Sequence, residues 1–397
     1  MPTAVLSGIT VLDLTRVMSG PYCTLMLADM GARVIKVEHP RHGDDTRAWG
    51  PPFVAGESAY FLSVNRNKDS LTLDFKQPDG RRILDAIIDR ADVLVENFKP
   101  GTLQRRGLDY ASLAERVPRL IYASISGYGH TGPLKGLSGY DAVTQAEGGL
   151  MSVTGEAAGP AFRLGVPIAD LVSGLFAAQG ILLALLERVT SGRGRHVDIS
   201  MLDSAAALLT YQAAAYLATG DTLPRMGNDH NSIVPYGSFV ARDGHLMIAV
   251  GNDDLWRQFC EVAGLSDIAA DERFATNPRR VGNRETLQPI LARVLQTRDR
   301  ADWIARLRAA GIPCGAVRSV GEMLADPQIQ ARDMITTVQH PAAGKVRLVA
   351  CPVKLADSPS RADRPPPTLG EHTDAILTKE LGFTEEQVRD LRQRHVV

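Results

Sequence analysis

Asp170 is the residue in this sequence with the clearest potential for chemistry. It directly precedes an almost unbroken apolar run, Leu171 to Leu186, and this run predicts a helix that is buried on most sides. A carboxylate in the first turn of a helix can accept hydrogen bonds from free backbone N–H groups, and the helix dipole favours its ionised form. We therefore expect Asp170 to stay ionised at neutral pH. It is either a simple N-cap or a buried carboxylate nucleophile, and the local pattern allows both readings.

Basic residues near the predicted strands suit a polyphosphate ligand. They are Lys68, Lys76, Lys99, Arg105 and Arg106. In a parallel sheet these cations would gather at the strand ends, where such sheets bind ligands, and both lysine and arginine bind phosphate. The alternative is ordinary solvated loop charge. The segment SGYGHTGPLKGLSGYDAV, residues 126–143, carries Tyr140 and Asp141, and its five glycines would let the backbone approach a ligand closely.

The composition argues against several classes of function. The 397 residues carry 44 lysines and arginines against 45 aspartates and glutamates, so no overall charge favours nucleic acid or an anionic membrane as a partner. The four cysteines form no CxxC pair, which argues against a zinc site or a disulfide framework and favours a reducing cytosol. The longest apolar run is shorter than the roughly 20 residues of a membrane span, and the first strand starts too early for a signal peptide. We expect a soluble, cytoplasmic protein without a metal site.

The elements that must position these residues predict an α/β fold. Ile9 to Leu14 and Ala32 to Glu38 are predicted strands joined by a helix over Cys23 to Met30, which makes a βαβ unit. The connecting loop TRVMSGP lacks the GxGxxG motif, so NAD binding is not expected. Further strands are predicted at 70–75, 92–98, 120–126 and 196–200, and a helix is predicted at 79–90.

A change in sequence character after Gly220 predicts a second domain. We expect residues 1–200 to form the first part of a large Rossmann-like domain, and residues 201–224 to form a linker helix. Residues 225–325 then alternate turns, short strands and helices, which predicts a smaller α+β domain. Residues 326–397 are expected to return and complete the large domain, ending in a helical tail.

Taken in order, a series of segments resembles the class III CoA-transferases over the length of the chain. The segments are LSGITVLDLTRVMSGP, GARVIKVE, NRNKDSLTLDF, VENFKPG, SGYG, SGYDAV, Asp170 with its helix, GRGRHVDISMLDS, SIVPYGSF and LGEHT. Within that class, GDDTRAWGPPFV, SVNRNK, GYDAV, SIVPY and RPPPTLGEHT are most similar to the succinyl-CoA:glutarate (hydroxymethylglutarate) CoA-transferases.

This resemblance implies roles for particular residues. Asp170 matches the family's nucleophile. Positions that hold CoA in the family match Val17, Leu73, Lys76, Asn97, Phe98 and Arg105, and His39 and Arg106 occupy neighbouring contact positions. The family fold is an interlocked homodimer. The implied partners are an acyl-CoA and a small carboxylic acid, with CoA as substrate and product and no permanently bound cofactor.

The chemistry of an aspartate agrees with this implied role. A carboxylate is already deprotonated, so it can attack a thioester carbonyl without a general base and form a mixed anhydride. The oxyanions that form need N–H donors, which we expect from the turn around Gly227 and from the SGYDAV loop.

The acceptor acid is predicted from a few side chains. Oxalate-using relatives carry a glutamine where this chain has Met18, and this apolar residue favours a longer or less polar acid. Arg47, Arg225 and His230 are the candidates for binding the distal carboxylate of a dicarboxylic acid.

Two other functions compete with acyl transfer. An α-methylacyl-CoA racemase shares the fold but uses a histidine directly before the loop aspartate, where this chain has Tyr140, a poor base at pH 7. Asp253 or Asp254 could imitate the racemase acid. A silent CoA-binding protein is the third possibility, and the presence of Asp170 argues against it.

Overall fold

The computed structural model describes residues 4–357 and 363–397, which divide into two units. The first unit contains Met1–Leu150, Leu164–Thr210 and Pro327–Val397, and the second contains Met151–Arg163 and Tyr211–Asp326. Residues 151–163, which the sequence analysis assigned to the large domain, therefore belong to the second unit. The reason is local pairing, because the N–H of Gly227 donates to the carbonyl of Gly155 at 2.9 Å.

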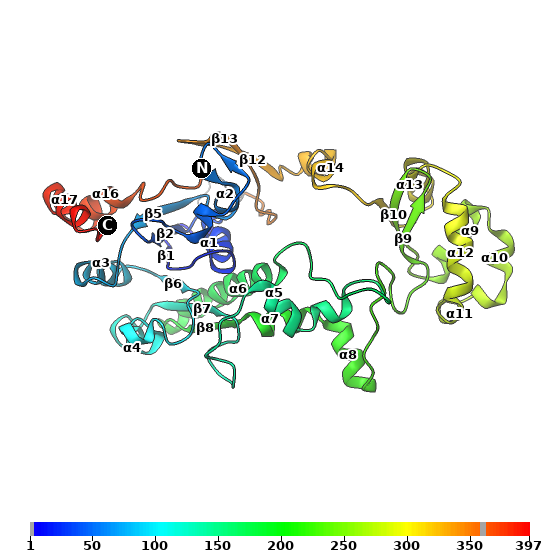
Figure 1. Ribbon diagram of the computed structural model, residues 1–397, viewed down its shortest axis with the longest axis horizontal. Helices are drawn as coiled ribbons and strands as arrows, with labels where there is room; N and C mark the ends of the chain where they lie inside the picture. The colour runs from blue at the N-terminus through cyan, green and yellow to red at the C-terminus, as the bar shows by residue number, and fades with distance from the viewer. Residues whose placement is uncertain (1–3, 358–362) are drawn as a thin grey trace. The chain divides into compact units, whose positions relative to one another are not determined.

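The first unit is built on a six-stranded parallel sheet with the order β5-β2-β1-β6-β7-β8 (Figure 1). Its strands are β1 (Thr10–Asp13), β2 (Arg33–Glu38), β5 (Lys68–Thr72), β6 (Val93–Glu96), β7 (Ile121–Ser126) and β8 (His196–Ser200). Counted along the chain, this is the order 3-2-1-4-5-6 of doubly wound folds, so the α/β prediction is confirmed. The direction of winding reverses between β1 and β6, and the carboxyl ends of these two strands flank the site where such sheets bind ligands.

Side chains alternate between two apolar layers. Leu12, Ile35 and Leu94 face a layer with α3 (Pro78–Ile88), α4 (Tyr110–Arg116) and α17 (Glu385–Gln393). Their neighbours Val11, Val34 and Val93 face the other layer, with α1 (Ser19–Asp29), α6 (Ile168–Ser191) and α7 (Met201–Leu208). Near-continuous apolar strands are the pattern of a sheet covered on both faces.

Two helices begin earlier than the sequence predicts, and both shifts affect the site. Helix α1 starts at Ser19 rather than Cys23. Pro21 is tolerated in the first turn, because the N–H that proline lacks would have no partner within the helix. Helix α6 starts at Ile168, two residues before Asp170.

Helix α6 has 24 residues, so it is long and apolar enough to cross a membrane. This is weak evidence, since helix α6 also packs Ala177 and Ile181 into the core of this unit. The sequence-based expectation that the apolar run is too short for a membrane span was wrong on length.

The C-terminal segment covers the outer edge of β5. The N–H of Ser70 donates to His372 Nδ1 at 3.2 Å, and the N–H of Thr72 donates to Thr373 Oγ1 at 3.0 Å. Directly after the strand, the N–H of Asp74 donates to the carbonyl of Val396 at 2.7 Å. Strand β5 starts two residues earlier than predicted, at Lys68.

The second unit has its own core around a three-stranded antiparallel sheet, β11-β10-β9. Trp256, Phe259 and Trp303 are fully buried in it. Its elements are β9 (Tyr236–Ala241), β10 (Gly244–Ala249), β11 (Cys314–Ala316), α9 (Asp253–Ala263), α10 (Ser266–Ala270), α11 (Asn277–Gly282), α12 (Arg284–Leu295), α13 (Arg300–Ala309) and α14 (Val320–Leu324), with α8 (Thr210–Thr219) at the boundary.

Short elements complete the first unit. They are the hairpins β3 (Phe53–Val54) with β4 (Glu57–Ser58) and β12 (Ile335–His340) with β13 (Gly344–Val349), and the helices α2 (Ala59–Val64), α5 (Asp141–Glu147), α15 (Pro327–Ala331) and α16 (Thr373–Ala375), the last followed by a π-helical turn (Ile376–Glu380).

Candidate active site

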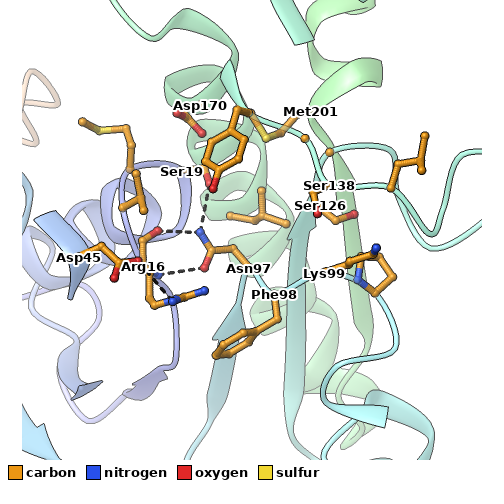
Figure 2. A pocket seen from close by; sticks show the side chains of 18 residues that line it. Arg16, Ser19, Asp45, Asn97, Phe98, Lys99, Ser126, Ser138, Asp170 and Met201 are labelled. Atoms are coloured by element: carbon orange, nitrogen blue, oxygen red, sulfur yellow. Dashed lines mark hydrogen bonds and ion pairs between the residues drawn. The ribbon is translucent and has the colours of Figure 1, made fainter. Parts of the chain in front are cut away.

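A cavity of about 210 Å³ lies at the point where the sheet reverses direction (Figure 2). The turn after β1, the residues after β6 and the start of α6 all contribute to its wall. The side chains that matter for its chemistry are Arg16, Val17, Met18, Ser19, Asp45, Asn97, Phe98, Lys99, Tyr140 and Asp170. We call it the Asp170 cavity.

Asp170 is the third residue of α6, and its side chain does not cap the helix. The cap comes from Asp141, whose Oδ1 accepts hydrogen bonds from the N–H of Ala169 at 2.9 Å and of Asp170 at 3.4 Å. Asp141 Oδ2 accepts from Gln145 at 2.7 Å, which fixes the capping carboxylate on α5. The N-cap alternative for Asp170 was therefore wrong, and its carboxylate is left to line the cavity.

The ionisation of Asp170 differs from the sequence-based expectation. Burial and the nearby charge of Asp141 raise the pKa of the Asp170 carboxyl to about 7, and a hydrogen bond from the Ser19 side chain opposes this shift. Burial, with the charges of Asp170, Asp141 and Asp44, raises the pKa of Tyr60 to about 12. Asp170 is therefore only partly ionised at neutral pH, because the expectation took account of the helix dipole but not of burial or of a second carboxylate.

The turn from Thr15 to Ser19 forms one wall of the Asp170 cavity. The side-chain amide of Asn97 binds the backbone of Arg16 in this turn. It accepts from the N–H of Arg16 at 2.9 Å and donates to the Arg16 carbonyl at 2.7 Å (Figure 2). The amide of Asn97 is thus engaged with the protein backbone. In this structure Asn97 supports the turn, and its contact with CoA stays a prediction.

A second cavity of about 300 Å³ gathers several of the predicted CoA residues. His39, Leu73, Lys76 and Phe98 line it, and we call it the His39 cavity. The ring of His39 stacks on His42 at 3.9 Å between centroids. Both Arg16 and Phe98 line this cavity and the Asp170 cavity, so the two adjoin. Aromatic faces beside a lysine suit a nucleotide.

The two arginines of the basic loop lie on a 3₁₀ turn, Gln104–Arg106. Arg105 is exposed, and its guanidinium lies over Gly101. Arg106 is half-buried, and its carbonyl accepts a hydrogen bond from Arg81. Both remain predictions as phosphate contacts.

Lys68 is not available for phosphate. Its ammonium is fully buried, and it donates to Asp13 at 3.2 Å, to the Pro21 carbonyl at 2.9 Å and to Asn65 at 3.0 Å. Burial lowers its pKa to about 8, although Asp13 opposes the shift. The prediction failed because Lys68 begins its strand, and the fold buries its ammonium against Asp13 at the end of β1.

The predicted acceptor residues separate into three groups. Met18, Tyr140 and Asp141 lie near Asp170, and Met18 packs with Tyr60 and Leu171. Arg47 does not join them, because it binds the Glu38 carboxylate through two hydrogen bonds of 2.7 and 2.8 Å. Its guanidinium also stacks on the Phe61 ring at 3.7 Å. The structure therefore excludes Arg47 as a free cation for a substrate carboxylate.

Three other candidates belong to the second unit. Arg225 donates to the Gly159 carbonyl at 2.7 Å, and His230 stacks on Tyr211 with its centroid 5.6 Å away. The N–H of Gly227 itself donates to the Gly155 carbonyl at 2.9 Å, and the role of the turn around it as an oxyanion donor stays a prediction. A glycine suits this turn because its φ is +61°.

Sequence reasoning missed Arg16, Ser19 and Tyr60. Arg16 and Ser19 flank the predicted contacts Val17 and Met18 in TRVMSGP, so their position in that loop was the available signal. Tyr60 gave no local signal, since only the fold brings α2 near Asp170. Among the described residues, 4–357 and 363–397, no group of three or more His, Cys, Asp or Glu side chains could hold a metal ion.

Comparisons with known proteins agree with this geometry. Residues 6–373 match the pattern of CoA-transferase family III. The chain is 41% identical to the succinyl-CoA:glutarate CoA-transferase of Mus musculus, covering 97% of this chain and 88% of that protein. It is 42% identical to the succinate–glutarate CoA-transferase of Agrobacterium fabrum, covering 94% and 95%. The crystal structure of a CAIB/BAIF family protein from Brucella suis superposes with a TM-score of 0.86 at 41% identity, covering 96% of this chain and all of that one.

Proposed function

Because this chain belongs to CoA-transferase family III, it is a CoA-transferase, and we propose that it moves CoA from succinyl-CoA to a dicarboxylic acid such as glutarate, with Asp170 as nucleophile. The observation that carries the proposal is the position of Asp170. Its carboxylate lines a cavity at the reversal point of the sheet, and that cavity adjoins a second one with the predicted nucleotide contacts.

The proposed reaction runs through four balanced steps. The Asp170 carboxylate attacks the thioester carbonyl, the C–S bond breaks, and an aspartyl–succinyl anhydride and CoA thiolate form. The thiolate then attacks the aspartyl carbonyl and releases succinate, leaving an aspartyl-CoA thioester. The acceptor carboxylate attacks this thioester and expels the thiolate again. Finally, the thiolate attacks the acceptor carbonyl of the new anhydride, which releases acyl-CoA and regenerates the Asp170 carboxylate.

The environment of Asp170 suits a nucleophile. Burial and the charge of Asp141 make its anion less stable than an exposed aspartate, which increases its reactivity toward a carbonyl. Ser19 keeps enough of the carboxyl ionised by donating a hydrogen bond to it. A pKa near 7 therefore balances reactivity against the ionised fraction at neutral pH.

We infer that the nucleotide part of CoA occupies the His39 cavity. Its lining supplies an aromatic face at Phe98, an apolar wall at Leu73 and a cation at Lys76. The pantetheine arm would then pass Phe98 and Arg16, which line both cavities, and bring the thioester to Asp170.

We infer that Arg16 binds the distal carboxylate of the acid. Arg16 and Lys99 are the cationic side chains among the described residues that line the Asp170 cavity. The guanidinium of Arg16 lies 5.4 Å from the centre of the Phe98 ring and forms an ion pair with Asp45 at 3.3 Å. Because both partners are about half exposed, this ion pair is weak and can give way to a substrate carboxylate.

We propose that the protein is a homodimer, interlocked as in the resembling family. Helix α6 presents Leu182, Leu183, Leu186 and Val189 as exposed apolar side chains, with exposed fractions of 46 to 82%. A second copy of the chain would cover them. Light scattering of the purified protein tests this, since a monomer at micromolar concentration would contradict it.

The test of the function is mass spectrometry of products formed from succinyl-CoA and a pool of free carboxylic acids. We expect a dicarboxylyl-CoA from the wild type and none from Asp170→Ala. The matched control is Asp254→Asn, which removes a carboxylate that is 79% exposed on α9. A transferase keeps its activity in this control. If Asp170→Ala still transfers CoA, the nucleophile is misassigned, and α-proton exchange in 2-methylacyl-CoA that depends on Asp254 would indicate a racemase.

A further inference from the structure

The turn between β1 and α1 has a backbone conformation that it would not adopt on its own. Val17, at its centre, has a φ of 69°, which lies in the left-handed region. A β-branched residue is strongly disfavoured there, because its Cβ approaches the backbone too closely. Such a conformation persists only where the surroundings over-determine it. The contacts of this turn therefore show what holds it.

Two buried charged side chains, Lys36 and Asp44, bind the backbone of the turn. The ammonium of Lys36 donates to the carbonyl of Thr15 at 2.9 Å. The carboxylate of Asp44 accepts from the N–H of Val17, with both oxygens 3.3 Å from that nitrogen. The N–H of the strained Val17 thus donates to the ionised carboxylate of Asp44, and a hydrogen bond to an ionised acceptor is stronger than one to a neutral acceptor.

Lys36 and Asp44 also bind each other. Their charged atoms are 2.9 Å apart, and both side chains have 0% exposure. Asp44 is held further by the N–H and hydroxyl of Thr46, at 3.0 and 2.7 Å. Burial opposes the charge of Lys36, but Asp44 and Asp13 keep its pKa above the usual value. The pair is therefore ionised.

A buried ion pair of this kind is a poor source of stability. The cost of removing two charges from water often exceeds their attraction, so apolar side chains of similar volume can replace such a pair without loss of stability. What this pair does that apolar side chains cannot do is bind the Thr15 carbonyl and the Val17 N–H at fixed points.

The turn leads directly into a residue beside the nucleophile. Two residues after Val17, Ser19 begins α1, and Ser19 and Asp170 line the same cavity (Figure 2), where the Ser19 side chain lowers the pKa of the Asp170 carboxyl. Asn97 supports the same arrangement, since its amide lies 3.5 Å from Ser19 Oγ (Figure 2). The position of the Ser19 hydroxyl therefore depends on the conformation of Val17.

We propose that Lys36 and Asp44 are positioning residues for acyl transfer, which hold the strained turn at Val17 so that the Ser19 hydroxyl faces the Asp170 carboxylate. This inference rests on the proposed function, in which Asp170 is the nucleophile. Three other charged groups face the pair, namely Asp13, Glu38 and Lys68. Asp13 also binds the start of the turn, because it accepts from the N–H and the hydroxyl of Thr15 at 2.9 and 2.5 Å. Among these charged groups, Asp44 is the one that accepts from the N–H of the strained Val17.

The first test compares Asp44→Asn with the wild type. The variant leaves Lys36 without its closest counter-ion and weakens the hydrogen bond to Val17, so the turn relaxes and Ser19 leaves Asp170. We expect kcat to fall at least tenfold, and the acid limb of the kcat profile to move up by about half to one pH unit, because Asp170 loses a donor that favours its anion. Lys36 and Asp44 also line the His39 cavity, so the Kd of CoA is measured in parallel, and a positioning role predicts that it changes less than kcat does.

A matched control separates positioning from stability. Arg66 and Asp29 form another buried pair in the same unit, with side-chain exposures of 3 and 2%. Asp29→Asn breaks that pair far from the turn, so it should lower the melting temperature like Asp44→Asn but leave kcat and the acid limb unchanged. If both variants lower kcat equally, the effect is structural and the proposal is overturned.

A second variant covers the case in which Asp44→Asn does not fold. Lys36→Met/Asp44→Leu replaces the pair with apolar side chains of similar volume. We expect it to fold but to show the same low kcat and raised acid limb, and Ser19→Ala should show the same acid limb with wild-type stability. A folded double variant with wild-type kcat and acid limb overturns the proposal. Residual transfer by Asp170→Ala would instead overturn the proposed function, so the two failures are distinguishable.

Discussion

Asp141 accepts a hydrogen bond from the backbone N–H of Asp170 at 3.4 Å, and its negative charge also raises the pKa of the Asp170 carboxyl. The same side chain therefore fixes the amino end of α6 and makes the anion of Asp170 less stable. A simple helix cap would do only the first. This relationship gives the site a measurable pH dependence and a measurable stability cost.

The rate of CoA transfer should depend on pH through Asp170. Its pKa is about 7, and only the carboxylate form attacks a thioester, so activity should be lost as the pH falls through 7. We expect kcat/KM to fall about tenfold per pH unit below that value and to be level above it. Initial rates from pH 5 to 9 check this. An acid limb near pH 4 would contradict the raised pKa.

Asp141→Asn should move this acid limb to lower pH. Asparagine caps a helix about as well as aspartate but carries no charge, so the pKa of Asp170 should fall by about one unit while the helix stays capped. The measurement is the kcat/KM profile, with circular dichroism to show that the fold is kept. An unchanged acid limb would mean that burial alone raises the pKa.

Asp170→Asn should abolish transfer and stabilise the protein above pH 7. In the unfolded chain an aspartate ionises near pH 3.8, whereas in the folded protein Asp170 ionises near pH 7. Between these values the folded state binds more protons, so its stability falls as the pH rises. Removing the group should add on the order of 2 kcal/mol at pH 8 and almost nothing at pH 4. Melting temperatures at both pH values test this, and equal gains would refute it.

Arg16→Gln should weaken the use of dicarboxylic acids more than that of monocarboxylic acids. Loss of a charge-assisted hydrogen bond to the distal carboxylate should raise KM for glutarate about 10- to 100-fold. KM for a monocarboxylate of equal length, such as valerate, should change little. Equal losses for both acids would show that Arg16 serves CoA or the turn instead.

Lys76→Ala should weaken binding of CoA by about tenfold if the His39 cavity holds the nucleotide. The effect should disappear with a pantetheine thioester, which has no nucleotide. Arg82→Ala is the matched control, because Arg82 lies on the nearby helix α3 and its side chain is 80% exposed. Isothermal titration measures both variants. Equal Kd values for Lys76→Ala and the wild type would show that the nucleotide does not bind in the His39 cavity.

Most of the parallel sheet and the family resemblance could be predicted from the sequence, and both are confirmed. Apolar strands such as Val93–Glu96 and the long apolar helix after Asp170 are local patterns, so a linear reading finds them. The resemblance also named His39, Leu73 and Lys76. These residues line one cavity, and their contact with CoA stays a prediction.

The errors at the site concern pairings that only the fold brings about. The sequence analysis treated Arg47 as a free cation, but in the fold its guanidinium binds the Glu38 carboxylate and stacks on the Phe61 ring. An N-cap was one of the two expectations for Asp170, but Asp141, 29 positions earlier in the chain, caps the helix instead. Such contacts depend on which residues the fold brings close together, and this cannot be predicted from residue type or from spacing in the sequence.

The C-terminal cover on β5 has a consequence for biosynthesis. Thr72 leaves the ribosome long before its partner Thr373, which lies 301 positions later, and the whole second unit is translated in between. Throughout that interval the edge of β5 is open, and an open edge can pair with other nascent chains. Leu73 and Lys76 follow this strand, and the backbone beside them binds Val396. The backbone beside the His39 cavity is therefore paired only after Val396 has been released from the ribosome, and a chain without Val396 and Val397 lacks two side chains of the core.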